Sequence, residues 1–270
     1  MKYSLYISLV VLISCFQNCG PVSFSASQGL DSGGNVTAFG NPNALPGNPD
    51  ASSPITAPEQ MNLICNFQGA TKTNWDITPA ATNLPNVTIS SQSSGADIPN
   101  ANNVDIFGSS GKNFIVKNAE ILKEFSNNSG NLIANVRSVG MINGDSGSID
   151  LNSNDVGDIL NFSADHLCVT AHSIQSLAHF SSGNVAISSS GATGSLSEIS
   201  SSSSGKLAII NMNINSISAG SGNIYIQGGH IKLIAHVSGD IYLDNVTVDQ
   251  LSASSSKVYL LNGAKVLTRD

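Results

Sequence analysis

Three tyrosines recur at intervals of 17 residues toward the end of the 270-residue sequence: Tyr225, Tyr242 and Tyr259. Each stands between two aliphatic residues of a short alternating segment, so its side chain is expected to point outward, away from theirs. A file of exposed tyrosines can stack on the sugar rings of a glycan or contact a surface protein, because tyrosine provides a large contact area at low entropic cost. The file can equally be structural, since like side chains on adjacent strands stack and stabilise a parallel sheet. The sequence leaves both interpretations open.

The five histidines do not predict a metal site. His166, His172 and His179 fall at different positions of one repeat, so they face different sides of the molecule. His179 and His236 occupy equivalent positions, but three repeats separate them. That separation corresponds to about 14 Å, which is too far for two ligands of one ion. We therefore expect neither a metal nor another cofactor.

The charged residues suggest neither catalysis nor nucleic-acid binding. Enzymes that cleave polysaccharides need close carboxylates, or a carboxylate with a basic partner, whereas Asp150 and Asp158 fall on different strands of one repeat. The 11 Lys and Arg residues are scattered and the net charge is −7, which excludes a phosphate-backbone partner. We expect no catalytic residues, and a carbohydrate-active enzyme is the least favoured of the functions considered.

The N-terminus carries a targeting signal. Lys2 provides a positive charge, and the apolar stretch at residues 5–13 is too short to span a bilayer as a mature helix. The following sequence Leu-Ile-Ser-Cys, which ends at Cys15, resembles the lipobox of bacterial lipoproteins. The resemblance implies cleavage before Cys15 and lipid attachment to it. Because Phe16 replaces the Asp that signals inner-membrane retention in that family, it also implies the outer membrane, periplasmic or surface-exposed. The alternative is an ordinary signal peptide that is cleaved elsewhere and takes Cys15 with it.

Residues 1–14 are thus the predicted signal peptide, and residues 15–60 a flexible tether rich in Gly, Pro, Asn and Ser. Export implies an oxidising compartment, in which disulfides persist. A lipid on Cys15 would leave three cysteines for pairing, and a Cys65–Cys168 bond would join the N-terminal segment to the repeats. Two unpaired thiols are the alternative.

An apolar ladder determines the fold class. Its members recur at steps of 17, 18, 18, 22, 17, 17 and 17 residues: Leu132, Ile149, Leu167, Val185, Leu207, Ile224, Ile241 and Val258. We number one turn from position 1 at Gly130 to position 17, which places this ladder at position 3, its apolar partners at position 5 and the tyrosines at position 4. A second apolar pair follows at positions 10 and 13, as in Val139 and Ile142. A fixed period of this kind is typical of a solenoid.

The second apolar pair predicts how each turn folds. Residues three apart in a flat strand face opposite sides, so both can point inward only if the chain turns a corner between them. Glycine at position 1, as in Gly147, allows a further corner through a positive φ. Because Ser, Asn and branched residues fill the turns, a helical interpretation fails. We predict an all-β chain, a single-stranded parallel β-helix with coils of about 17 residues, in which four extra residues near Ser189–Gly194 form a side loop.

The regular β-solenoid is expected over residues 130–270, and an irregular N-terminal cap with the first coils over residues 61–129. Within this cap, residues 61–67 are predicted to form a first strand. Ile115 is placed one period before Leu132, although Lys117 then falls at an apolar position.

The segments 221–226, 238–243 and 256–260 resemble the Ser-Gly-Asp-Ile-x-Val turns of bacterial adhesin-like β-solenoid families. The resemblance implies an extracytoplasmic β-solenoid with an adhesin-like role and carries no catalytic residues with it. The predicted function is therefore an outer-membrane lipoprotein that binds a glycan or a surface protein, with the membrane as a second partner through the lipid. The main alternative is a structural envelope protein that assembles through the end of its solenoid. The sequence leaves the oligomeric state open.

Overall fold

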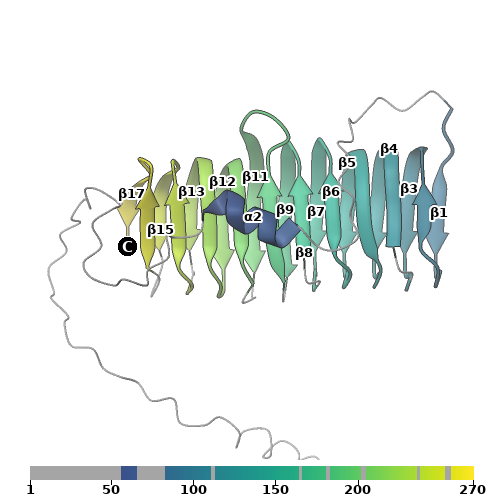
Figure 1. Cartoon of the computed structure of the whole chain (residues 1–270), viewed down its shortest axis with the longest axis horizontal. Helices are drawn as coiled ribbons and strands as arrows, with labels where there is room; N and C mark the ends of the chain where they lie inside the picture. The colour runs from purple at the N-terminus through teal and green to yellow at the C-terminus, as the bar shows by residue number, and fades with distance from the viewer. Residues whose placement is uncertain are drawn as a thin grey trace, which may run out of the picture. The chain divides into compact units, whose positions relative to one another are not determined.

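The computed structural model describes residues 56–65, 83–110, 113–163, 166–180, 183–201, 205–235, 238–252 and 257–270. The predicted signal peptide, Cys15 and nearly all of the predicted tether lie outside these ranges. The described part of the chain is one helix on a parallel β-solenoid of about nine turns, with about 18 residues from one coil to the next. The predicted fold class is therefore confirmed (Figure 1).

Two faces of the solenoid carry the strands. The face with positions 3–5 contains β2 (Ala96–Ile98), β6 (Ile149–Asn152), β8 (His166–Thr170), β10 (Asn184–Ser188), β14 (Ile241–Asp244) and β16 (Val258–Leu261). The face with positions 10–13 contains β1 (Val87–Ser90), β3 (Ala101–Phe107), β7 (Asp155–Leu160), β9 (Ser173–Phe180), β11 (Gly194–Ser201), β15 (Thr247–Ser252) and β17 (Lys265–Arg269). Four long strands continue from one face to the other: β4 (Asn113–Ser126), β5 (Asn131–Asn143), β12 (Leu207–Ala219) and β13 (Ile224–Ala235).

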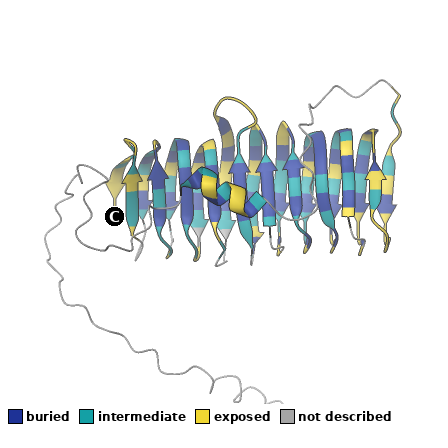
Figure 2. Ribbon diagram, viewed as in Figure 1, coloured by how far each residue is buried: buried dark blue, intermediate teal, exposed yellow. Residues whose placement is uncertain are grey.

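The residues of the predicted ladder are pairing partners in adjacent strands of the first face. Leu132 pairs with Ile149, and each later member pairs with the next, as far as Ile241 with Val258. The 22-residue step keeps this register because the extra residues form the loop between the end of β10 and the start of β11. The ladder side chains are buried in one continuous core, with the exception of the last, Val258, which is half-buried. Figure 2 shows buried segments recurring from strand to strand along the solenoid.

The corner between positions 10 and 13 is also present. Val139 pairs with Val156 and Ile142 with Ile159, whereas the glycine at position 11, Gly140, has no partner in the register. All four apolar side chains are buried. The chain bends at position 11, which turns two residues three apart toward the same core.

Glycine at position 1 is explained mainly by close packing between coils. A Cβ on Gly147 would collide with the carbonyl oxygen of Gly130 in the preceding coil, and Gly205 and Gly239 meet the preceding coil in the same way. The expected positive φ occurs at Gly183 and Gly222. Elsewhere, most of the left-handed residues fall in two other columns: position 15 in the first half (Gly108, Asn127, Gly144, Asn161, His179) and position 7 in the second (Asn211, Gly228, Asn245, Asn262). Asparagine and glycine tolerate this conformation better than most residues do.

Two expectations for residues 61–129 are wrong. Residues up to Cys65 belong to helix α2 (Ala57–Cys65) instead of a first strand, so the helix also takes the last residues of the predicted tether. The register at the start of β4 is shifted by one residue, because Phe114 and not Ile115 pairs with Leu132, whereas Leu122 and Phe125 later in the strand pair with Val139 and Ile142 at the expected interval of 17. This shift places Phe114 in the core and leaves Lys117 exposed, and it removes the conflict of a lysine at an apolar position.

Candidate binding surface

Helix α2 begins with a capping box. The Thr56 backbone N–H donates to Glu59 Oε2 at 2.7 Å, and the Glu59 N–H donates to Thr56 Oγ1 at 3.4 Å. Pro58 is accommodated because it lies in the first helical turn, where backbone N–H groups have no intrahelical acceptor. The hydrogen bonds from Thr56 lower the pKa of the Glu59 carboxyl. The Thr-x-x-Glu pattern was the sequence signal for this helix, but the alternation of apolar residues from Met61 onward pointed to a strand.

The helix lies on the outside of the first face and contacts β8, β10, β12 and β13 (Figure 1). Nine residues of helix rise about 13 Å, close to the roughly 14 Å that separate four successive strands of the solenoid. Its buried residues are Ala57, Gln60 and Ile64, whereas Leu63 on the opposite side is 63% exposed. One apolar face of α2 thus covers four coils.

The surface beneath α2 is made of residues at position 4. Ala57 and Ile64 form a cluster there, separate from the solenoid core, with Cys168, Ala186, Ala208 and Tyr225. Three of the four position-4 side chains are small, which leaves room for a helix above the strands. Where α2 is absent, the equivalent residues Ile133 and Asp150 are larger and half-exposed.

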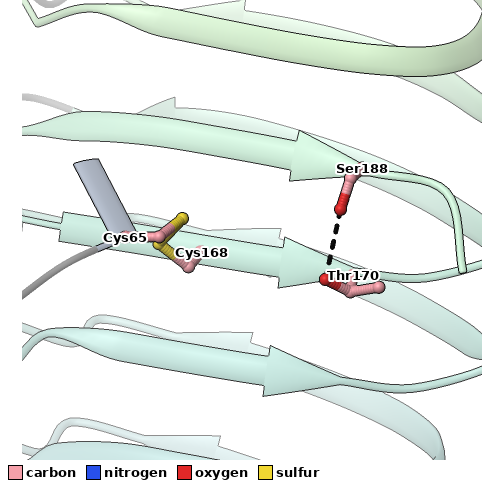
Figure 3. Close-up of a disulfide and its surroundings, with 4 residues drawn as sticks. All are labelled: Cys65, Cys168, Thr170 and Ser188. Atoms are coloured by element: carbon pink, nitrogen blue, oxygen red, sulfur yellow. Dashed lines mark hydrogen bonds between the residues drawn. A yellow bond between two sulfur atoms is a disulfide. The ribbon is translucent and has the colours of Figure 1, made fainter. Parts of the chain in front are cut away.

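A disulfide joins α2 to this surface. Cys65, the last residue of the helix, is bonded to Cys168 of β8, with 5.6 Å between their Cα atoms. Figure 3 shows this bond beside the contact between the hydroxyls of Thr170 and Ser188, which lie 3.1 Å apart on β8 and β10. The pairing considered from the sequence is therefore present in the structure.

The three tyrosines form a stacked ladder. The ring centroids of Tyr225 and Tyr242 lie 4.7 Å apart with an interplanar angle of 4°, and those of Tyr242 and Tyr259 lie 4.6 Å apart at 5°. The expectation that all three are exposed is wrong. Tyr225 is only 4% exposed because it lies at the end of the surface that α2 covers, whereas Tyr242 and Tyr259 are half-buried.

Polar residues at position 2 flank the tyrosine hydroxyls. The Asn223 side-chain amide donates to the hydroxyl of Tyr225 at 3.4 Å. One coil later, the pKa of Tyr242 is raised to about 12, chiefly by burial and also by the neighbouring Asp240 carboxylate, which accepts a hydrogen bond from the hydroxyl. The Tyr242 hydroxyl therefore stays protonated at physiological pH and is a hydrogen-bond donor. No repeated residue type in the sequence marks this polar row.

The stacking geometry limits what the ladder can bind. Rings that lie 4.6–4.7 Å apart leave no room for a sugar between them. Only the outer face of Tyr259 can receive a sugar ring, because one face of this ring is covered by Tyr242. What the ladder presents along its length is ring edges and hydroxyl groups, a surface that suits contact with another protein.

The other residues considered for chemistry do not converge in the described part of the chain. His230 Nε2 lies 2.7 Å from Asp249 Oδ1, in an exposed pair on the second face. His172 and His179 lie at different positions of one coil, and His236 is outside the described residues. Among the residues that the structure describes, no group of three His, Cys, Asp or Glu side chains is placed to hold a metal ion.

One buried carboxyl lies apart from the tyrosine surface. Asp145 is completely buried at position 16, where the preceding coil has Asn128 and the following coil has Phe162. Burial raises the pKa of the Asp145 carboxyl to about 8, although the backbone groups of Ser146, Gly147 and Asn128 partly oppose the shift. Those groups lie nearby without good hydrogen-bonding geometry, and no described group pairs with either carboxyl oxygen. By contrast, the Asn128 amide is satisfied: its oxygen accepts from the Ser109 N–H and its nitrogen donates to the Ile106 carbonyl.

Comparison with family models, curated proteins and solved structures finds no match to this chain. The described residues contain no helix that is long and apolar enough to cross a bilayer. The candidate surface is thus defined by its own geometry: a helix-covered part on β8, β10, β12 and β13, and the uncovered tyrosines of β14 and β16.

Proposed function

We propose that this chain is a lipid-anchored binding protein of the bacterial outer membrane, and that the tyrosine ladder contacts a partner protein. The observation that carries the proposal is the half-exposed pair Tyr242 and Tyr259, which continues the surface beneath α2 past the end of the helix. Tyrosine edges beside an amide and a carboxylate combine apolar contact with hydrogen bonds, as protein interfaces do.

The anchor is proposed from the lipobox resemblance at Cys15 and from the long polar segment that follows it. We propose that the tether predicted from the sequence composition keeps the solenoid clear of the membrane without fixing its orientation. Such an arrangement suits binding in the envelope better than catalysis, because a free surface on a tether can search for a partner. We therefore propose a binding role and no enzymatic activity.

Cross-linking in cells tests the binding surface. A photo-reactive amino acid replaces Tyr259 in one strain and Lys232, which is exposed on the second face, in a control strain. A discrete protein adduct from position 259 alone, lost on the additional change Tyr242→Ser, supports the proposal. Absence of that adduct with an intact solenoid would show that the ladder is structural. A glycan array completes the test. Binding of the wild-type protein to a glycan, lost in the single variant Tyr259→Ser, would show that the partner is a sugar and not a protein.

Metabolic labelling with a clickable fatty acid tests the anchor. We expect the label on the wild-type chain and on Cys19→Ser, and its loss in Cys15→Ser together with release from the membrane fraction. Labelling that persists in Cys15→Ser would refute the assignment of Cys15. Added protease on whole cells then separates surface exposure from a periplasmic location.

A further inference from the structure

Helix α2 conceals the position-4 residues of four successive coils. Cys168, Ala186, Ala208 and Tyr225 have exposed fractions of 2%, 1%, 0% and 4%. The outward residue of the preceding coil, Asp150, is half-exposed, and so is Tyr242 in the coil that follows. Because position 4 points away from the solenoid core, these four residues are buried by α2 and not by the solenoid itself.

The helix has few means of staying in place by itself. A helix of nine residues is marginal in water, so α2 depends on its contact with the solenoid. That contact is small and incomplete: Ala57 and Ile64 are its fully buried apolar residues. Gln60 is buried as well, and its side-chain oxygen has no hydrogen-bonding partner among the described groups, which opposes docking. The disulfide from Cys65 supplies the covalent attachment.

We propose that the Cys65–Cys168 disulfide is a redox latch: its reduction releases α2 and uncovers the position-4 surface from Cys168 to Tyr225. The uncovered residues pair in series with Tyr242 and Tyr259. Release thus extends the exposed strip from two coils to six, or to a length of about 24 Å. Stronger binding of a partner protein by the longer strip rests on the proposed function. Release of the helix does not depend on it.

The chemistry is thiol–disulfide exchange with a dithiol reductant, such as an oxidoreductase with a Cys-x-x-Cys pair. A thiolate of the reductant attacks Sγ of Cys65, the half-buried partner, and the thiolate of Cys168 leaves and takes up a proton. The second thiol of the reductant then displaces Cys65. Two electrons and two protons pass to the two cysteines, and the reductant ends as a disulfide.

Hydrogen exchange on the mature chain, before and after reduction with dithiothreitol, tests the latch. We expect the amides of α2 to exchange at least about 100-fold faster after reduction, since local opening of the helix sets their rates. Iodoacetamide should then label Cys168, which is buried in the oxidised protein. Strand β5 lies outside the four strands on which α2 packs, β8, β10, β12 and β13, so it should keep its protection and shows that the solenoid stays folded.

Two variants sharpen the test. Cys65→Ser should behave as the reduced protein without any reductant. Leu63→Ser changes the exposed side of the same helix and should behave as the oxidised wild type. Continued protection of α2 after reduction would overturn the latch, and so would loss of protection in β5, because the disulfide would then stabilise the whole fold.

The cross-linker at position 259 separates the latch from the proposed function. An adduct that increases after reduction supports both. If α2 is released and no adduct forms in either redox state, the latch stands and the proposed function is refuted.

Discussion

Replacing Asp145 by asparagine should remove a large pH dependence from the stability of the solenoid. The wild-type carboxyl is completely buried, and its pKa of about 8 compares with 3.8 in the unfolded chain. Because the folded-state pKa is the higher one, the folded protein binds this proton more tightly than the unfolded chain does. The resulting stabilisation is complete below pH 3.8 and is lost as the pH rises toward 8.

The magnitude of this pH dependence follows from the uptake of a single proton by the Asp145 carboxyl. Between pH 5 and pH 7 the unfolded chain has released it and the folded protein has not, so the free energy of unfolding falls by about 1.4 kcal/mol per pH unit. That amounts to about 3 kcal/mol over this interval, a large share of the stability of an ordinary domain. An asparagine has no proton to release, and its amide can repeat the hydrogen bonds of Asn128 in the preceding coil.

Urea unfolding from pH 5 to pH 8 measures the effect. We expect the stability advantage of Asp145→Asn over the wild type to grow by about 3 kcal/mol between pH 5 and pH 7. Asp155→Asn is the matched control, since it removes one exposed carboxyl and leaves the buried one in place. Its pH dependence should follow that of the wild type. Parallel curves for the wild type and Asp145→Asn would refute the conclusion that this carboxyl is buried in its neutral form.

Three further predictions concern local structure. Thr56→Ala removes the N-cap of α2 and should cost about 1 kcal/mol, measured as faster hydrogen exchange in the helix. Gly144→Ala places a side chain at a φ of 66° and should cost about 1–3 kcal/mol in urea unfolding, whereas Gly191→Ala, with nothing within 4 Å, should be nearly neutral. Phe114→Ala should lower the free energy of unfolding by about 3–5 kcal/mol, and Ile115→Ala should lower it much less. The reverse order would support the register expected from the sequence.

The sequence by itself determined the solenoid. Each coil repeats the contacts of the one before it, so residues one period apart, such as Leu132 and Ile149, are also pairing partners in the sheet. Even the 22-residue step could be aligned in this way. The corner at position 11 followed because two inward residues three apart cannot share a flat strand. The register failed only before Leu132, where Ile115 is as apolar as Phe114 and the step is 18 residues. A one-residue shift inverts the side chains of the short segment from Phe114 to Val116, and the local sequence does not decide between the two alignments.

Tertiary structure alone decided what happens on the outer face. The pattern placed Tyr225, Tyr242 and Tyr259 outward, but it could not show that α2 covers the first of them. Residues 57–65 and the position-4 row are more than 100 residues apart, and nothing in a repeat predicts where a segment outside it will pack. The small residues Ala186 and Ala208 fit that helix only once its place is known. The sequence therefore specified a ladder of tyrosines, because stacking depends on the period, whereas the exposure of each ring depends on a long-range contact.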